Sequence, residues 1–426
     1  MKKFLALIIA LVMALSLVAC GEQKQPDNPD VPDDGQQTAT VKVGFITLHD
    51  ENSTYDLNFI NAAKEAIANL GLTDADYILK TNVPEGQECY ETAMNLVDEG
   101  CNIIFADSFG HEPYMIDAAK EHPEVQFCHS TGTRAHTENL ANYHNAFASI
   151  YEGRYLAGIA AGLKLNEMIE AGQFTADEAK MGYVGAFTYA EVVSGYTSFF
   201  LGARSVCPTV TMDVTFTGSW YDETLEKEGA EKLIQGGCKL ISQHADSLGA
   251  PTACENAGVP NVSYNGSTKD ACPNTFIVSS RIDWAPYYEM CIKAVMDGAE
   301  IPADWTGTLA TGSVVLTDVN ETAAAAGTAE AIAAATEKLE KGEIHVFDCA
   351  NFTTKVDDKV NTFKADYLKL DETGHITSYM ADVDTDAAYT GDTEVIKDGY
   401  FAESEFRSAP YFDLQIDGIN LLDTAM

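Results

Sequence analysis

The sequence predicts an α/β protein with two doubly wound lobes and a C-terminal α+β extension. Short apolar segments alternate with amphipathic helical segments at the spacing of β-α-β units. The apolar segments are mostly continuous rather than alternating with polar residues, which is typical of parallel strands buried on both faces. The pattern restarts near Ile150, so we expect two sheets of the same kind.

In the first lobe, each predicted strand is followed by a polar loop and a helix. The first helix carries apolar residues three and four apart from Phe59 to Leu70, and Gly71 ends it. The predicted strands are residues 41–47, 77–80, 101–106 and 125–129.

The second lobe is predicted to open with a long helix over residues 151–165, whose Gly and Ala residues permit close packing. Its strands are expected at 180–185, 210–216, 240–243, 261–264 and 276–280. Helices are expected at 193–206, 224–235, 251–257 and 285–296.

The C-terminal segment has a different pattern. Residues 323–340 are rich in Ala and predict a helix, and residues 344–347 and 412–416 predict strands. Residues 353–408 alternate polar and apolar positions with many Asp and Gly, which predicts a strand-rich or loop-like insertion.

Residues 1–20 have the parts of a secretory signal: two lysines, an uncharged apolar run over 4–19, and a break at Cys20. The run is slightly short for a bilayer span, and no stop-transfer pattern follows it. Residues 17–20, Leu-Val-Ala-Cys, look like a bacterial lipobox, in which Cys20 is lipidated after cleavage. The alternative is an ordinary cleaved signal with an incidental cysteine. Residues 21–40 are rich in Pro, Asp and Gln and predict a disordered tether.

Net charge limits the classes of partner. The formal net charge is −39 at pH 7, so phosphates would be repelled and we expect no nucleic-acid partner. After the leader and tether, roughly 385 residues remain, enough for two sizeable cores.

The cysteine and histidine patterns argue against a metal site. Nine cysteines follow Cys20, no Cys-x-x-Cys occurs, and most lie in apolar segments, so we expect small buried side chains. A disulfide framework is the alternative. No histidine pair has metal-ligand spacing, and we expect neither a metal nor a cofactor.

Ligands of open α/β sheets bind beyond the carboxyl ends of the strands. Aromatic and short polar side chains occur together at these positions, which suits a flat, neutral ligand that forms hydrogen bonds. The residues that follow the predicted strands are Asp50, Ser53, Tyr55, Asp107, Ser108, Phe109, Tyr189, Trp220, Tyr221, Asp222, His244, Asp246, Ser247, Asn265, Asp283 and Trp284.

The sequence contains little evidence of catalysis. It contains no Gly-x-Ser-x-Gly elbow and no phosphate-binding Gly-x-x-x-x-Gly-Lys-Ser/Thr motif. His244 and Asp246 are two residues apart, which does not indicate a catalytic triad. We therefore expect a binding protein rather than an enzyme.

Several motifs occur together in a recognisable order. They are the lipobox, Val-Gly-Phe-Ile-Thr at 43–47, the helix at 151–162, Gly-Ser-Trp-Tyr-Asp at 218–222, Gln-His-Ala-Asp-Ser at 243–247 and Arg-Ile-Asp-Trp at 281–284. In this order the chain resembles the basic membrane protein (Bmp) family of ABC-transporter solute-binding lipoproteins. The likeness runs from about residue 41 to residue 320.

The resemblance implies a periplasmic-binding-protein type I fold, in which two Rossmann-like lobes are joined by a three-crossing hinge. It implies an N-terminal lobe of residues 41–148 with 281–308 and a C-terminal lobe of 149–280 with 309–426. The lobes would close on a purine nucleoside or purine base.

The resemblance also assigns roles by position. Tyr55 and Trp220 would stack on the base, and Asp107 or Ser108 would contact its edge. The further polar contacts would come from Asp246, Asn265 and Asp283. Two departures from the family pattern leave open whether the ligand is a nucleoside or a free base. The family's Asp-x-Ser-Phe-Asn appears here as Asn-Ser-Thr-Tyr-Asp at 52–56, and residues 281–283 lack the ribose-binding Lys of some members.

The sequence thus predicts a lipid-anchored protein on the extracytoplasmic face of a bacterial membrane, which passes a purine-type solute to an ABC permease. A sugar or another small metabolite is an alternative ligand. The sequence is also compatible with a surface receptor or adhesin that uses the C-terminal extension, and with an exported nucleoside-processing enzyme.

Overall fold

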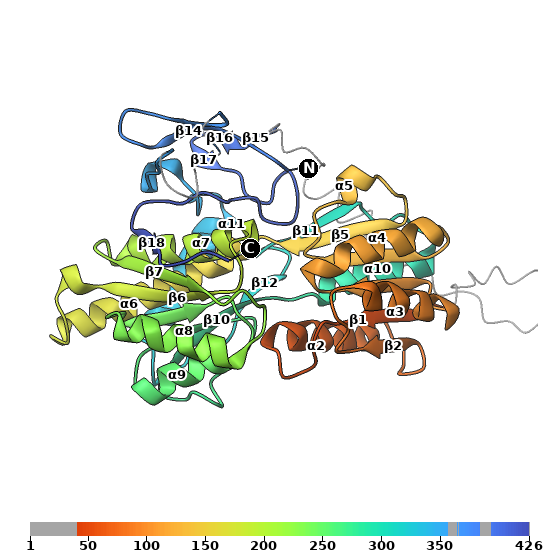
Figure 1. The fold of residues 1–426 in the computed structure, drawn as a ribbon, viewed down its shortest axis with the longest axis horizontal. Coiled ribbons are helices and arrows are strands. Elements are labelled where there is room, and N and C mark those ends of the chain that lie inside the picture. The colour runs from red at the N-terminus through yellow and green to blue at the C-terminus, as the bar shows by residue number, and fades with distance from the viewer. Residues whose placement is uncertain (1–40, 357–363, 365, 384–392, 426) are drawn as a thin grey trace, which may run out of the picture. The chain divides into compact units, whose positions relative to one another are not determined.

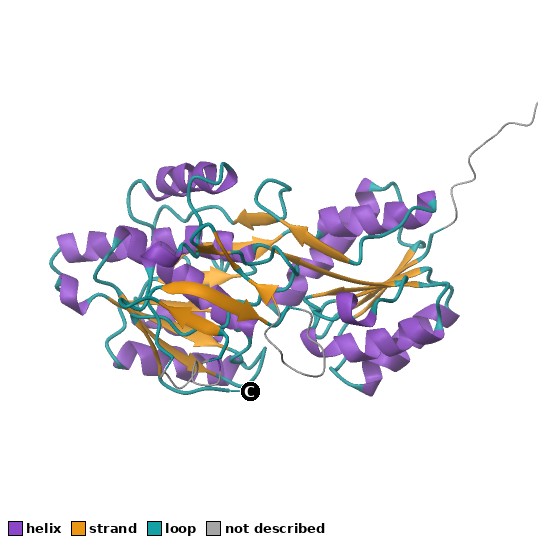
Figure 2. Cartoon of the chain, turned by 90° about the horizontal axis from the view of Figure 1, so that it is seen from above, coloured by secondary structure: helices purple, strands orange, loops and turns teal. Residues whose placement is uncertain are grey.

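The computed structural model describes residues 41–356, 364, 366–383 and 393–425, and the predicted signal, lipidation site and tether lie outside these residues. The chain from Ala39 to Met426 forms one compact unit. It is built on two main sheets, each with helices on both faces (Figure 1; Figure 2).

The first sheet has six parallel strands in the order β11-β5-β4-β3-β1-β2. We call this sheet and its helices the first lobe. Helices α2 and α10 pack on one face around Phe59, and α3 and α4 pack on the other around Leu96. The strands are β1 (Val43–Ile46), β2 (Tyr77–Lys80), β3 (Ile103–Ala106), β4 (Gln126–Ser130), β5 (Tyr143–Ala148) and β11 (Asp304–Gly307), and the helices are α2 (Thr54–Asn69), α3 (Gln87–Asp98), α4 (Glu112–Glu121), α5 (Ala135–Glu138) and α10 (Ala285–Asp297).

The second sheet has seven strands in the order β12-β10-β9-β8-β6-β7-β18, with only β12 antiparallel to its neighbour. This sheet and its helices form the second lobe. Helices α6 and α7 cover one face and α8 and α9 cover the other. The strands are β6 (Lys180–Gly185), β7 (Thr211–Phe216), β8 (Leu240–Gln243), β9 (Asn261–Tyr264), β10 (Phe276–Ile282), β12 (Val314–Leu316) and β18 (Ile419–Leu421), and the helices are α6 (Ile150–Glu170), α7 (Ala190–Val206), α8 (Glu223–Gln235) and α9 (Gly249–Ala257).

The chain passes between the two sheets three times, after β5, after β10 and after β11. The predicted fold class, two doubly wound lobes joined by a three-crossing hinge with a C-terminal α+β extension, is therefore confirmed. The residue boundaries of the two lobes stay a prediction. No helix in the described part of the chain is both long and apolar enough to cross a membrane.

The C-terminal extension contacts both lobes. Phe347 stacks on Phe412 at a ring distance of 4.3 Å, and both belong to the core that contains α6 and α7. The backbone N–H of Ser408 donates to Asp304 Oδ2 at 2.7 Å, on the edge strand of the first sheet. The regular elements of this extension are α11 (Thr328–Glu340), β13 (Leu368–Leu370), β14 (Ile376–Ala381), β15 (Thr393–Glu394), β16 (Ile396–Lys397) and β17 (Tyr400–Phe401).

Two strand predictions in the extension are wrong. Residues 344–347 and 412–416 are irregular, and their apolar side chains are buried against other segments rather than along a ladder. Isolated bridges at Asp348 and Ile416 are the extended pairings that form there. The helix predicted from residue 323 begins at Thr328, after a turn with Gly327 at φ 81°.

The nine cysteines from Cys89 to Cys349 are all buried and unpaired, as predicted. Burial raises the pKa of the Cys238 thiol to about 12, so this side chain behaves as a small apolar group at neutral pH.

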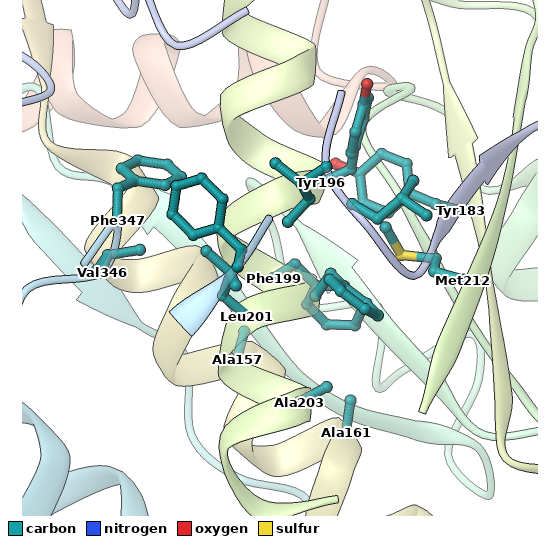
Figure 3. Packing of buried hydrophobic residues seen from close by; sticks show 14 of the residues in the cluster. Ala157, Ala161, Tyr183, Tyr196, Phe199, Leu201, Ala203, Met212, Val346 and Phe347 are labelled. Atoms are coloured by element: carbon teal, nitrogen blue, oxygen red, sulfur yellow. The ribbon is translucent and has the colours of Figure 1, made fainter. Parts of the chain in front are cut away.

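Helices α6 and α7 approach each other closely because glycine occupies the contact points. A Cβ added at Gly202 would lie 2.0 Å from the carbonyl oxygen of Tyr155, and one at Gly158 would lie 2.0 Å from that of Phe199. Figure 3 shows the small side chains of Ala157, Ala161 and Ala203 together with larger aromatic side chains of the same core, among them Tyr196 and Phe199. This face of the second lobe therefore has no room for a larger residue.

We expect Gly202→Ala to lower the free energy of unfolding by about 2–3 kcal/mol, because the methyl group would force the two backbones apart. Chemical denaturation of the variant measures this loss. The control is Gly229→Ala in α8, where the nearest atom is 3.4 Å away and alanine favours the helix by about 1 kcal/mol. Equal stability of Gly202→Ala and the wild type would contradict this packing.

Candidate ligand-binding site

A cavity with an empty volume of about 350 Å³ lies between the two lobes. It is formed at the carboxyl ends of strands from both sheets, beside the points where strand order reverses, next to β1 in the first sheet and next to β6 in the second. The lining residues are Leu48, Tyr55, Asp56, Ser108, Phe109, Thr131, Glu191, Trp220, His244, Asp246 and Tyr264.

The N-terminus of α2 holds the first wall of the cavity in place. Ser53 caps the helix by accepting from the backbone N–H of Asp56, and its hydroxyl donates to Asp56 Oδ2 at 2.6 Å. Asp56 Oδ1 accepts from the backbone N–H of His49 at 2.8 Å. The hydroxyl of Tyr55 donates to the carbonyl oxygen of Asp107 at 2.6 Å, which holds the outer end of the ring. This network fixes the direction of the Tyr55 ring at the cavity wall.

Asp107 follows β3 and is 1% exposed. Its Oδ1 accepts from the backbone N–H of Leu48 at 3.2 Å, while Oδ2 has no partner among the described residues. Burial, together with the nearby Asp56 carboxylate, raises the pKa of Asp107 well above its usual range. A buried carboxyl with a free oxygen is a group that a ligand's hydrogen-bond donor can satisfy.

Thr131 follows β4 and adopts a left-handed backbone conformation with φ 74°. This conformation is costly for a β-branched residue and is seen mostly at functional positions. The Thr131 hydroxyl is buried and has no partner in the described part of the chain. The strained turn therefore presents a free hydroxyl at the cavity.

Aromatic rings surround Trp220 in the second lobe. Its ring lies edge-on to Phe187 at 5.0 Å and tilted against Tyr189 at 6.1 Å and His244 at 6.4 Å. Tyr189 in turn contacts Phe109 of the first lobe at 5.3 Å. The half-buried indole therefore offers a flat apolar surface whose orientation its neighbours limit.

Asp246 joins the two lobes. Its carbonyl oxygen accepts from both the backbone N–H and the hydroxyl of Thr54 in the first lobe, each at 3.0 Å. Its side-chain Oδ1 accepts from Nδ2 of Asn265 at 3.3 Å. Burial and the neighbouring carboxylates raise the pKa of Asp246 well above its usual range. These bonds across the cavity hold the lobes in a closed arrangement.

His244 and Glu191 form a polar pair on the second-lobe side. His244 Nε2 lies 3.4 Å from Glu191 Oε1, and Nδ1 lies 3.4 Å from the Tyr183 hydroxyl. Burial lowers the pKa of His244, so the ring is neutral at physiological pH.

The lining is acidic: it includes Asp56, Glu191 and Asp246, with Asp107 directly behind, and no Lys or Arg lines this cavity in the described part of the chain. Such a set can form hydrogen bonds with the hydroxyl and amino groups of a ligand, and it offers no cation to a phosphate. The described residues also contain no cluster of His, Cys, Asp and Glu suited to a metal ion.

Six of the predicted site residues line the cavity, namely Tyr55, Ser108, Phe109, Trp220, His244 and Asp246. Two more, Asp107 and Asn265, are bonded directly to lining residues.

Asp283 and Trp284 do not line the cavity. Asp283 accepts from the backbone N–H of Ala285 at the start of α10, and Trp284 is 1% exposed and stacks on Phe59 at 4.5 Å. Their predicted ligand contacts stay untested by the structure.

Residues that the prediction did not select also line the cavity: Leu48, Asp56, Thr131, Glu191 and Tyr264. Tyr264 is the last residue of β9, and Leu48 lies two residues after β1, so a wider window at the strand ends would have included both. No such signal marks Thr131 or Glu191 in the sequence. Thr131 reaches the cavity because of its left-handed backbone, and Glu191 reaches it because of the direction of helix α7.

Two doubly wound lobes that meet over a cavity at the carboxyl ends of their strands define a solute-binding protein. A family model for Bmp, described as "ABC transporter substrate-binding protein PnrA-like", matches residues 44–348. The chain belongs to the Bmp family of ABC-transporter substrate-binding proteins.

The chain is 32% identical over 261 residues to a purine-binding protein of Brucella abortus, covering 61% of this chain and 69% of the relative. It is 34% identical over 207 residues to a putative ABC transporter glucose-binding protein of Haloferax volcanii, covering 48% of this chain and 49% of that protein. An ABC transporter solute-binding protein structure from Conexibacter woesei shares the fold, with a TM-score of 0.59 and 19% identity, covering 72% of this chain and 98% of that one.

Glu226 supports the loop that carries Asp246. Its carboxylate accepts from the backbone N–H of Ser247 at 3.1 Å and from that of Asp222, the N-cap of α8, at 3.0 Å. Burial raises the pKa of Glu226 from 4.5 to about 7. The folded protein therefore retains a proton that the unfolded chain releases between these pH values.

Because the pKa of Glu226 is raised on folding, its contribution to the free energy of unfolding is fully present below pH 4.5. This contribution is lost as the pH rises through 7. We expect Glu226→Gln, which keeps one acceptor oxygen but cannot ionise, to reduce the fall in unfolding free energy between pH 5 and pH 8 by about 2 kcal/mol. Denaturant titrations at both pH values measure the difference. Glu228→Gln, at an exposed position of the same helix, is the control. An unchanged pH dependence in Glu226→Gln would show that the buried carboxyl does not titrate in this range.

Proposed function

We propose that this protein captures a purine nucleoside or purine base by closure of its two lobes and delivers it to an ABC permease. The single observation that carries the proposal is the cavity between the lobes, in which Tyr55 and Trp220 from opposite lobes accompany buried carboxyls. Aromatic faces stack on a flat heterocycle, and carboxyl oxygens accept from its amino groups and from ribose hydroxyls. The similarity to the Brucella purine-binding protein supports the same class of ligand.

The acidic lining favours the unphosphorylated ligand. A nucleotide would bring its phosphates close to the carboxylates of Asp56 and Glu191 without a cation among the lining residues to compensate. A nucleoside or base avoids this cost and supplies donors for the same oxygens.

A sugar is the second candidate, because the Haloferax relative is named as a putative glucose-binding protein. Aromatic faces and carboxylates also bind pyranose rings, through the apolar face of the sugar and its hydroxyls. If stacking contributes most of the binding free energy, a purine base would bind without its ribose. If hydrogen bonds to the carboxyls contribute most of it, a sugar would bind without a base.

Isothermal titration of residues 39–426 against adenosine, guanosine, inosine, adenine, ribose and glucose distinguishes these ligands. We expect saturable binding of a purine compound, weakened in Trp220→Ala by about 5- to 150-fold because stacking on an aromatic ring contributes about 1–3 kcal/mol per base. Tyr114→Ala removes a half-buried ring of α4 away from the cavity and is the control. Binding of glucose alone would replace the purine proposal, and the absence of binding across the panel would refute both.

We further propose that Cys20 carries a lipid and holds the protein on the extracytoplasmic face of the membrane. The lipobox pattern at 17–20 and the polar segment after it support this placement. A tethered binding protein stays close to its permease, which raises their effective concentration.

In a bacterial host that lipidates exported proteins, we expect Cys20→Ser to abolish incorporation of labelled palmitate and to release the protein from the membrane fraction. The control variant Cys272→Ser, at a buried position, should keep the label. Labelling that persists in Cys20→Ser would contradict lipidation at this residue.

A further inference from the structure

His244 lines the cavity, and one of its two ring nitrogens contacts a group that lies outside the cavity. One ring nitrogen, Nδ1, lies toward Tyr183 inside the second lobe, and the other, Nε2, lies toward Glu191 at the cavity. A neutral imidazole carries its proton on one nitrogen only, so one of these sides donates and the other accepts. Burial keeps His244 neutral by lowering its pKa.

Arg154 of α6 lies behind this pair and is fully buried. Its guanidinium faces the rings of Tyr264 at 4.6 Å, Tyr183 at 5.3 Å and Phe199 at 5.6 Å, so aromatic faces surround the cation. Its Nη2 donates to the Tyr183 hydroxyl at 2.5 Å and to the carbonyl oxygen of Gln243 at 3.3 Å. Its Nε and Nη1 have no hydrogen-bond partner among the described residues, so the cation is held without a direct carboxylate contact.

The direction of the hydrogen bonds follows from the chemistry of arginine. A guanidinium has five N–H donors and no acceptor, so the Tyr183 oxygen must accept from Arg154. The hydroxyl hydrogen of Tyr183 is then free to donate, and Nδ1 of His244 is the acceptor within 3.4 Å. Burial raises the pKa of Tyr183 to about 12, so this hydrogen is present at neutral pH.

We propose that Arg154 is a positioning residue that acts through Tyr183 to fix His244 in the tautomer with its proton on Nε2. Nδ1 then accepts inside the lobe, and the Nε2–H group donates toward Glu191 and the cavity. His244 and Glu191 both line the cavity, so a ligand acceptor placed there can share this N–H with Glu191.

The fixed tautomer determines which edge of a ligand the site recognises. Glu191 and His244 thus present an acceptor beside a donor at the cavity wall. The matching ligand edge has a donor beside an acceptor, such as an amino group next to a ring nitrogen or a hydroxyl next to an ether oxygen. This consequence rests on the proposed function, whereas the tautomer itself does not.

The tautomer is measured directly by ¹⁵N NMR of the full chain in detergent with ¹⁵N-labelled histidine, where protonated and unprotonated ring nitrogens resonate far apart. His244→Gln identifies the signals of this residue. We expect the wild type to show an unprotonated Nδ1 and a protonated Nε2 without any ligand. In Tyr183→Phe, which keeps Arg154 and the ring but removes the hydroxyl, we expect a mixture of both tautomers.

Arg154→Met tests the first step of the same chain of bonds, because a freed Tyr183 hydroxyl can either donate or accept. If that variant fails to fold, Tyr183→Phe alone carries the test. Tyr143→Phe is the matched control, since it removes a buried hydroxyl that contacts Glu112 in the first lobe. A proton on Nδ1, a doubly protonated ring, or an unchanged tautomer in Tyr183→Phe would overturn the proposal.

The binding readout uses adenosine as the probe. We expect Tyr183→Phe to weaken adenosine binding by about 3- to 10-fold, the effect of one hydrogen bond, while Tyr143→Phe leaves it unchanged. If neither adenosine nor another purine compound of the panel binds the wild type, the proposed ligand class fails and the NMR signals still decide the tautomer. If adenosine binds and the tautomer is not fixed, the role of Arg154 fails alone.

Discussion

The whole site depends on one constraint: the parallel strands of both sheets have their carboxyl ends at the same cavity. A parallel sheet places every strand-to-helix loop at one edge, so each lobe offers a row of loops and helix N-termini there. The hydrogen bonds from Thr54 to the carbonyl oxygen of Asp246 bring the two edges together. Tyr55 and Trp220, far apart in the sequence, become walls of one cavity only in this closed arrangement.

The lobes divide the work of recognition. The first contributes Tyr55 at the cavity wall and, directly behind it, the buried Asp107, whose Oδ2 has no hydrogen-bond partner among the described residues. The second contributes Trp220 within its aromatic surroundings and the pair of His244 and Glu191. Neither set encloses a small molecule alone, and this explains why affinity would depend on closure and why binding can change the population of the closed state.

The fold was predictable to a large extent because its signals are local. Continuous apolar runs and helical spacing indicated most strands of both lobes, as did the loops that follow them. The strands β5, β11, β12 and β18 and the irregular segments around Phe347 and Phe412 were not predicted. Asp304 and Trp305 pair at a sheet edge through long-range contacts, and Phe347 is buried by stacking rather than by a ladder, so neither carries a strand pattern.

The sequence by itself determined the two-lobe class, the acidic character of the chain and most loops that hold the site, because periodicity and strand ends are read along the chain. Tertiary structure alone decided that Trp284 is buried on Phe59, and that Thr131 and Glu191 reach the cavity. It also decided that Arg154 lies behind His244. The physical reason is that burial, strain at a left-handed residue and the direction of a hydrogen bond depend on neighbours distant in sequence.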